Sequence, residues 1–142
     1  MAIRTANAVW HGTLREGKGR IAFGSGAFEG AYSFASRFEE GVGTNPEELI
    51  GAAHAGCFSM AFSAGLTKAG FQPKRVATTA SVHLDKVGEG FKITTVDLKT
   101  EAEVPGIEQA MFMELAEGAK KNCPVSQALT GVTITLQAAL VS

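Results

Sequence analysis

The sequence lacks several features that would have indicated a function at once. Lys plus Arg number 13 and Asp plus Glu number 14, which gives a formal net charge of −1 at pH 7 without any basic run. This balance argues against nucleic acid as the main partner and against binding to an anionic membrane surface. The chain also lacks an internal repeat, a low-complexity tract and a linker, so we expect residues 1–142 to form a single domain.

Long hydrophobic runs are missing as well. The first twelve residues, MAIRTANAVWHG, contain no apolar stretch long enough for a signal peptide. Residues 49–66 have one strongly polar member, His54, but ten of the eighteen are Gly, Ala or Ser. Such a weakly hydrophobic stretch favours a buried core helix over a membrane span. We therefore expect a cytoplasmic protein without a membrane partner, in a compartment where thiols are held reduced.

Cysteine is scarce: Cys57 and Cys123 are the only two in the chain. A structural disulfide is disfavoured in a reducing compartment, so a pair there is more often catalytic or redox-active, if the two meet in space. The chain has no C-x-x-C or H-x-x-x-H spacing, and its three histidines are scattered along the sequence. It also has no Gly-rich phosphate loop between a strand and a helix. We therefore expect neither a metal nor a bound cofactor.

What the sequence does contain is typical of an α+β domain with a hydrophobic core, since 45% of residues are apolar and 19% are charged. The expected order is β-β-β-α-β-β-α-β. A one-residue shift in the alternating pattern near Thr94 and Thr95 predicts a β-bulge. We expect strands at residues 6–14, from 21 onward, at 31–34, 76–84, 91–104 and 132–140, helices at 46–69 and 107–121, a helical turn at 124–130, and a loop at 37–43.

The first long helix has a clear start. Asn45 suits the N-cap, Pro46 the first helical position, and Glu48 the partner position of a capping box. Small residues occupy every face of the helix that follows, which predicts a buried helix packed closely against a second helix, in the same chain or in another copy.

Five side chains are candidates for chemistry, each with a plain structural alternative. Cys57 is either an inert buried cysteine or a reactive thiol, which would need a positive neighbour. Cys123 either fills an N-cap or is stabilised as a thiolate at the start of a short helix. Arg37 suits a surface position, and Glu47 has no evident structural task. His54 precedes Cys57 by three residues, so it is either a general base for that thiol or, more commonly, a core histidine.

Two segments taken together are more specific than any single residue. TNPEELIGAAHAGCFSMA at residues 44–61 and NCPVSQAL at residues 122–129 resemble the two cysteine motifs of the OsmC/Ohr family of bacterial peroxidases. The stretches FASRF at residues 34–38 and VHLDKV at residues 82–87 are also similar to that family. The resemblance covers essentially the whole chain. GAAH and CPVSQ indicate the osmotically inducible OsmC branch rather than the Ohr branch.

The resemblance implies an intertwined homodimer with two long central helices enclosed by sheets. It also implies a peroxidase for organic hydroperoxides and hydrogen peroxide. Cys57 matches the peroxidatic cysteine, Cys123 the resolving cysteine, Arg37 the activating arginine and Glu47 the carboxylate that holds the arginine. The implied reductant is an external dithiol of the lipoyl type rather than thioredoxin. His54 matches no catalytic position.

The implied chemistry is consistent with these residue types. A guanidinium lowers the pKa of a nearby thiol and can stabilise a leaving alkoxide, and a carboxylate can aim it through a bidentate contact. Glu47 and Cys57 lie roughly 15 Å apart along one helix, so we expect Glu47, or the Arg37 it holds, to serve Cys57 of the other subunit. Apolar side chains are available for a pocket that favours bulky organic peroxides, among them Phe34, Phe58, Met60, Met111 and Phe112.

Two other functions fit the residues less well. One is a non-catalytic module that binds an apolar ligand and has two spectator cysteines. The other is a protein thiol–disulfide oxidoreductase, against which the missing C-x-x-C weighs.

Overall fold

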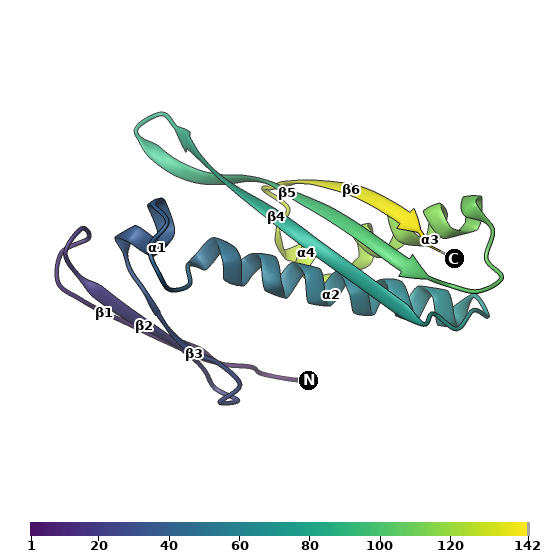
Figure 1. The fold of residues 1–142 in the computed structure, drawn as a ribbon, viewed down its shortest axis with the longest axis horizontal. Coiled ribbons are helices and arrows are strands. Elements are labelled where there is room, and N and C mark those ends of the chain that lie inside the picture. The colour runs from purple at the N-terminus through teal and green to yellow at the C-terminus, as the bar shows by residue number, and fades with distance from the viewer. Residues whose placement is uncertain (142) are drawn as a thin grey trace. The chain divides into compact units, whose positions relative to one another are not determined.

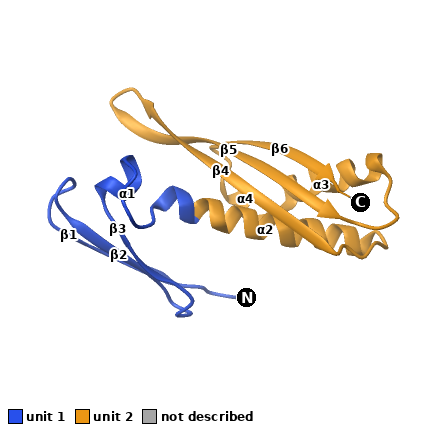
Figure 2. Ribbon diagram, in the orientation of Figure 1, with its two compact units in different colours: residues 1–49 blue, residues 50–142 orange. Residues whose placement is uncertain are grey.

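The computed structural model describes residues 1–141 and divides into two compact units, Met1–Leu49 and the chain from Ile50 onward (Figure 2). Both units combine strands with helices, as Figure 1 shows, which confirms the expected α+β class. Two short helices, at residues 34–38 and 124–128, join the eight elements of the expected order.

Unit 1 contains a three-stranded antiparallel sheet in the order β1-β2-β3. Its strands are β1 (Ala6–His11), β2 (Lys18–Phe23) and β3 (Glu29–Tyr32). β1 ends three residues before the expected position, because Gly12 takes a φ of 96° and the indole N–H of Trp10 donates to the Gly12 and Thr13 carbonyls. The rings of Trp10 and Tyr32 lie over Gly19, where an added Cβ would come within 2.4 Å of Tyr32. Only glycine allows this close packing.

The expectation that residues 37–43 form a loop is wrong at its start, because α1 (Phe34–Phe38) occupies that position. Ser33 is the N-cap, and its hydroxyl accepts from the Ser36 N–H while the Ser36 hydroxyl accepts from the Ser33 N–H. This reciprocal capping box stabilises a turn too short to show a hydrophobic period. Arg37 therefore lies in the last turn of a helix, not in a loop.

The long helix α2 (Pro46–Lys68) begins as predicted, with the Asn45 side chain accepting from the Glu48 N–H at 2.7 Å. The Glu48 carboxylate, however, accepts from the Thr44 hydroxyl rather than completing a capping box. The helix ends before Gly70, whose φ of 98° suits a helix C-terminus. Within one chain α2 is not buried on every face, since Met60 is 76% exposed.

Unit 2 contains a sheet in the order β4-β5-β6, formed by β4 (Arg75–Val87), β5 (Gly90–Glu103) and β6 (Thr133–Leu140). β4 and β5 are antiparallel, and their register passes from His83↔Thr95 to Leu84↔Ile93, so Thr94 is the extra residue of the predicted bulge. β6 runs parallel to β5. A parallel neighbour needs a crossover, which α3 (Gln109–Asn122) and α4 (Pro124–Ala128) provide.

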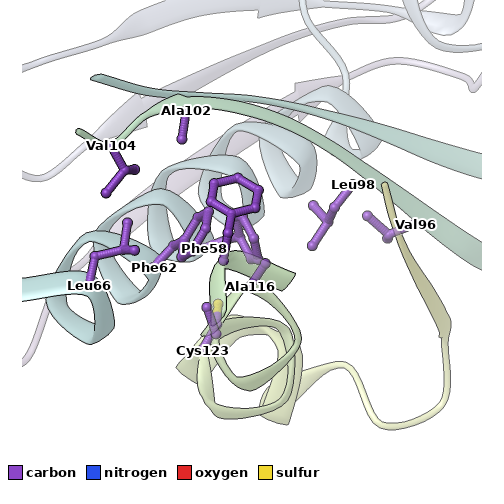
Figure 3. Close-up of a cluster of buried hydrophobic side chains, with 11 residues drawn as sticks. Phe58, Phe62, Leu66, Val96, Leu98, Ala102, Val104, Ala116 and Cys123 are labelled. Atoms are coloured by element: carbon purple, nitrogen blue, oxygen red, sulfur yellow. The ribbon is translucent and has the colours of Figure 1, made fainter. Parts of the chain in front are cut away.

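The core of unit 2 lies between its sheet and its helices (Figure 3). Phe58, Phe62 and Leu66 of α2 are fully buried there against β5 and α3, and the rings of Phe62 and Phe112 lie 5.3 Å apart. α2 is long and apolar enough to cross a membrane by length and composition. Phe58 and Phe62 are fully buried, as in a core helix, but 28% of the apolar stretch is buried within one chain, so the expected burial on every face is not seen there.

Removing one ring from this core should show how much it stabilises the unit. Phe62→Ala deletes a fully buried side chain that contacts two other rings, so the free energy of unfolding should fall by about 3–5 kcal/mol. Val87→Ala, at a half-exposed position of β4, should change it by less than about 0.5 kcal/mol. Denaturant titration measures both values, and equal losses would contradict this assignment of the core.

Candidate active site

The two cysteines, far apart in the sequence, are in contact in unit 2. Both are free thiols, and their side chains are hydrogen-bonded to each other. Cys57 lies in the middle of α2, and Cys123 lies at the junction of α3 and α4, beside the aromatic core of Figure 3. Pro124 has no N–H and disfavours helical backbone before it, so α3 ends there and Cys123 takes φ −54° and ψ 124°. The condition for a redox pair, that the two thiols meet, is therefore met.

The two thiols differ in exposure and in pKa. Cys57 is partly exposed, whereas Cys123 is completely buried. Burial raises the pKa of Cys57, and the hydrogen bond with the Cys123 thiol raises it further, against the Val125 N–H, which lowers it. Burial also acts to raise the pKa of Cys123, but the Cys57 thiol, the Ser126 and Val125 N–H groups and the Ser126 hydroxyl together lower it. The groups of unit 2 thus favour ionisation of Cys123 over ionisation of Cys57, and a positive group beside Cys57 would favour the Cys57 thiolate.

Unit 1 contains a cation, Arg37, that is held by a carboxylate. Arg37 and Glu47 form a bidentate ion pair, with Nε–Oε1 at 3.0 Å and Nη2–Oε2 at 2.9 Å. The last turn of α1 supplies Arg37 and the first turn of α2 supplies Glu47, which is buried. The guanidinium also lies 5.3 Å from the centre of the Phe38 ring. Contacts on two sides fix the orientation of a side chain that is otherwise flexible.

A cavity of about 390 Å³ lies beside Arg37 in unit 1. Its walls are mostly apolar, with the guanidinium as the charged group, which suits a ligand with an apolar body and a polar oxygen. The lining residues are Trp10, Gly12, Leu14, Tyr32, Ser33, Phe34, Arg37 and Phe38.

The five apolar residues that were candidates for one pocket lie in different parts of the structure. Phe34 lines the cavity beside Arg37. Phe58 and Phe112 instead pack into the core of unit 2 and are completely buried, because they lie on the helix faces that meet the sheet. Met60 and Met111 are exposed.

Ser126 is a residue that the sequence interpretation missed. The buried ring of His54 makes its hydrogen bond to Ser126, with Nε2 2.7 Å from Oγ, and not to Cys57. Nδ1 of His54 has no partner among the described residues. Burial lowers the pKa of His54, so the ring is neutral. The available signal was the spacing in Cys-Pro-Val-Ser, which places a hydroxyl in the same short helical turn as Cys123.

No group of three or more His, Cys, Asp or Glu side chains is placed to hold a metal ion within residues 1–141.

Comparison with known proteins identifies the family. The family described as OsmC-like protein matches residues 39–137. Peroxiredoxin OsmC of Escherichia coli is 51% identical over 127 residues, which cover 89% of each chain. An organic hydroperoxide resistance protein of Xanthomonas axonopodis is 37% identical over 100 residues, 68% of each chain. The chain therefore belongs to the OsmC family, and the higher identity to OsmC agrees with the branch inferred from its motifs.

Solved structures show the same fold. An organic hydroperoxide resistance protein OsmC of Legionella pneumophila superposes with a TM-score of 0.76 at 27% identity, covering 98% of this chain and 99% of the other. OhrB of Bacillus subtilis superposes with a TM-score of 0.69 at 23% identity, covering 94% and 97%.

The neutral His54 predicts how stability depends on pH. The unfolded ring titrates near pH 6.5 and the folded ring at a lower pH, so between these values the unfolded chain binds more protons. The free energy of unfolding should therefore decrease as the pH falls below about 6.5, by up to about 1.4 kcal/mol per pH unit.

Denaturant titrations between pH 7 and pH 5 measure this slope. His54→Gln should flatten it, whereas His11→Gln, at an exposed position, should leave it unchanged. A slope that survives in His54→Gln would assign it to another group.

Proposed function

We propose that this protein is a thiol-dependent peroxidase that reduces organic hydroperoxides and hydrogen peroxide, with Cys57 as the attacking cysteine and Cys123 as the resolving one. The observation that carries the proposal is the contact between a partly exposed and a buried thiol. Cys57 is the sulfur that reaches solvent, which supports this order of the two cysteines. The family of the chain and the names of its relatives, peroxiredoxin OsmC and organic hydroperoxide resistance protein, support the reaction class.

The reaction has two steps on the enzyme. The Cys57 thiolate attacks one oxygen of the peroxide, the O–O bond breaks, and the other oxygen takes a proton and leaves as alcohol or water. Cys57 is then a sulfenic acid, and attack by Cys123 forms a disulfide and releases water. An external dithiol must reduce that disulfide, and we expect a lipoyl-type dithiol. Sulfur carries both electron pairs, so the reaction needs no bound cofactor.

We expect Arg37, held by Glu47, to supply the positive charge that favours the Cys57 thiolate. A guanidinium beside Cys57 would move ionisation toward that thiol and stabilise the leaving oxyanion. Glu47 is the positioning residue, because its bidentate contact aims the guanidinium. The apolar cavity beside Arg37 favours organic peroxides with a bulky apolar part.

We also propose that the working protein is a cytoplasmic homodimer whose residues 1–142 act as one OsmC-like domain. The face of α2 around Met60, rich in small residues and exposed in one chain, supports close packing against a second copy. The uninterrupted course of α2 from Pro46 to Lys68 supports a single domain.

Substitution of each cysteine separates the two steps. Cys57→Ser should abolish peroxide consumption with a dithiol, because the attacking sulfur is gone. In Cys123→Ser, peroxide should still oxidise Cys57 once. Turnover should then depend on direct reduction of the Cys57 sulfenic acid by the dithiol. A peroxide-consumption assay with cumene hydroperoxide and mass spectrometry of both thiols measure this. Full activity of Cys57→Ser would favour a module that binds an apolar ligand. Rapid reduction of insulin by the wild-type protein would favour a protein thiol–disulfide oxidoreductase.

Hybrid dimers test whether the site is shared between subunits. In a dimer of one Glu47→Ala chain and one Cys57→Ser chain, a shared site leaves one complete set of residues and about half the activity. If Glu47 serves Cys57 of its own chain, neither site is complete and activity is lost. Activity of the purified mixed dimer decides between the two arrangements, with each parental homodimer as the control.

A further inference from the structure

Four side chains form a continuous polar chain through the interior of unit 2. His54 Nε2 lies 2.7 Å from Ser126 Oγ, the Ser126 hydroxyl is hydrogen-bonded to Cys123, and Cys123 is hydrogen-bonded to Cys57. His54 and Cys123 are fully buried, Ser126 nearly so, and only Cys57 reaches solvent. A buried polar chain that ends at a reactive thiol is costly unless its members are paired, so it calls for an explanation.

The direction of these hydrogen bonds follows from the number of protons. Ser126 has one hydroxyl hydrogen, and if this hydrogen is donated to the Cys123 sulfur, Ser126 can only accept from His54. Nε2 of His54 then carries the ring proton, and Nδ1 is an acceptor. The opposite tautomer would take the hydroxyl hydrogen from the sulfur and would also leave an Nδ1–H buried without an acceptor among the described residues. The first arrangement is favoured, because it leaves only a buried acceptor without a partner. Buried N–H groups without a partner are rarer than buried acceptors without one.

In this arrangement His54 is a fixed donor and not a base. Its ring is neutral, and its one proton is committed to Ser126. It therefore acts on Cys123 only through Ser126. His54 lies on α2, one turn before Cys57, and Ser126 lies on α4, so the bond also ties together the two elements that present the thiols.

We propose that His54 and Ser126 are positioning residues for the second step of the reaction. His54 holds the Ser126 hydroxyl so that it donates to the Cys123 sulfur. This holds the Cys123 sulfur in place, with a hydrogen bond that favours its thiolate form, when Cys57 becomes a sulfenic acid. The Cys123 thiolate then attacks the Cys57 sulfur, the S–S bond forms, the S–O bond breaks, and the departing hydroxide combines with the proton that Cys123 lost, giving water. This inference rests on the proposed function.

The test measures the two steps separately. Protein is mixed with one equivalent of cumene hydroperoxide, samples are quenched with a sulfenic-acid trap, and intact-mass spectrometry follows Cys57 oxidation and the Cys57–Cys123 disulfide. In Ser126→Ala and His54→Leu, Cys57 should be oxidised at least as fast as in the wild type, because a proton held more firmly on Cys123 favours the Cys57 thiolate. Both should form the disulfide about tenfold to a hundredfold more slowly, as expected from the loss of a hydrogen bond to a charged sulfur. Excess peroxide should then convert more Cys57 to sulfinic acid than in the wild type.

Two variants distinguish positioning from general disruption. His54→Gln retains an N–H donor and should restore disulfide formation to near the wild-type rate. Ser59→Ala removes a hydroxyl from the same helix, one bonded to Thr78 at 2.7 Å, and should change neither step. Failure of His54→Gln to restore the rate, or an equal delay in Ser59→Ala, would overturn the proposal.

A second measurement does not depend on the reaction. In a Cys57→Ser background Cys123 is the one remaining thiol, and the pH dependence of the ultraviolet absorbance of its thiolate gives its pKa without a reagent that must reach the buried sulfur. The groups that act on this sulfur are the residue 57 side chain from α2 and, from α4, the N–H groups of Val125 and Ser126 and the Ser126 hydroxyl. Ser126→Ala and His54→Leu should each raise the Cys123 pKa, and His54→Gln should not. Ser126→Ala is a small change, so the test stands even if His54→Leu fails to fold.

The outcomes separate this inference from the proposed function. A wild-type protein that forms no Cys57 sulfenic acid and no disulfide with peroxide overturns both. A wild-type protein that forms the disulfide quickly, with Ser126→Ala and His54→Leu equally quick and an unchanged Cys123 pKa, overturns only the role of His54 and Ser126.

Discussion

The contact between Cys57 and Cys123 is the feature on which the rest of the site depends. It requires a long helix to hold one thiol at its midpoint and a helix break to hold the other beside it. The break comes from Pro124, which ends α3, and the alignment comes from the aromatic core of α2 against β5 and α3. The parallel strand β6 requires the crossover in which that break lies. The architecture of unit 2 and the contact between its two thiols therefore have the same cause.

Each of the two units has its own group of ionisable side chains. Within unit 2, hydrogen bonds lower the pKa of the buried Cys123 thiol, whereas burial and the Cys123 thiol raise the pKa of Cys57. In unit 1, the Glu47 carboxylate fixes the orientation of the Arg37 guanidinium. The raised pKa of the Cys57 thiol protects it from unselective oxidation, because only the thiolate is strongly nucleophilic. The Cys123 thiol is shielded from solvent by burial.

Sequence patterns predicted the features that depend on neighbouring residues. The Asn45 cap and the bulge at Thr94 could both be predicted from the sequence. A helix cap follows from the spacing of its residues, and a bulge follows from a shift in the alternation of apolar and polar residues. α1 could not be predicted, because five residues are too few to show a helical period. Its capping box also consists of two serines, Ser33 and Ser36, rather than a serine and the usual acidic partner. The bond between His54 and Ser126 joins residues 72 positions apart, and no local pattern reports such a contact. The roles of Cys57, Cys123, Arg37 and Glu47 came from resemblance rather than from periodicity.

The position of the cysteine pair in the topology has a mechanical consequence. Residues 57 and 123 enclose the second half of α2, both long strands of the larger sheet and all of α3. A covalent link between them closes a loop that contains most of unit 2 and sharply limits the conformations of its unfolded chain. In the chain-entropy treatment, a loop of this length corresponds to about 4 kcal/mol. The oxidised protein should therefore resist unfolding more than the reduced one, so a thermal melt would report the redox state of the two sulfurs without any spectroscopic label.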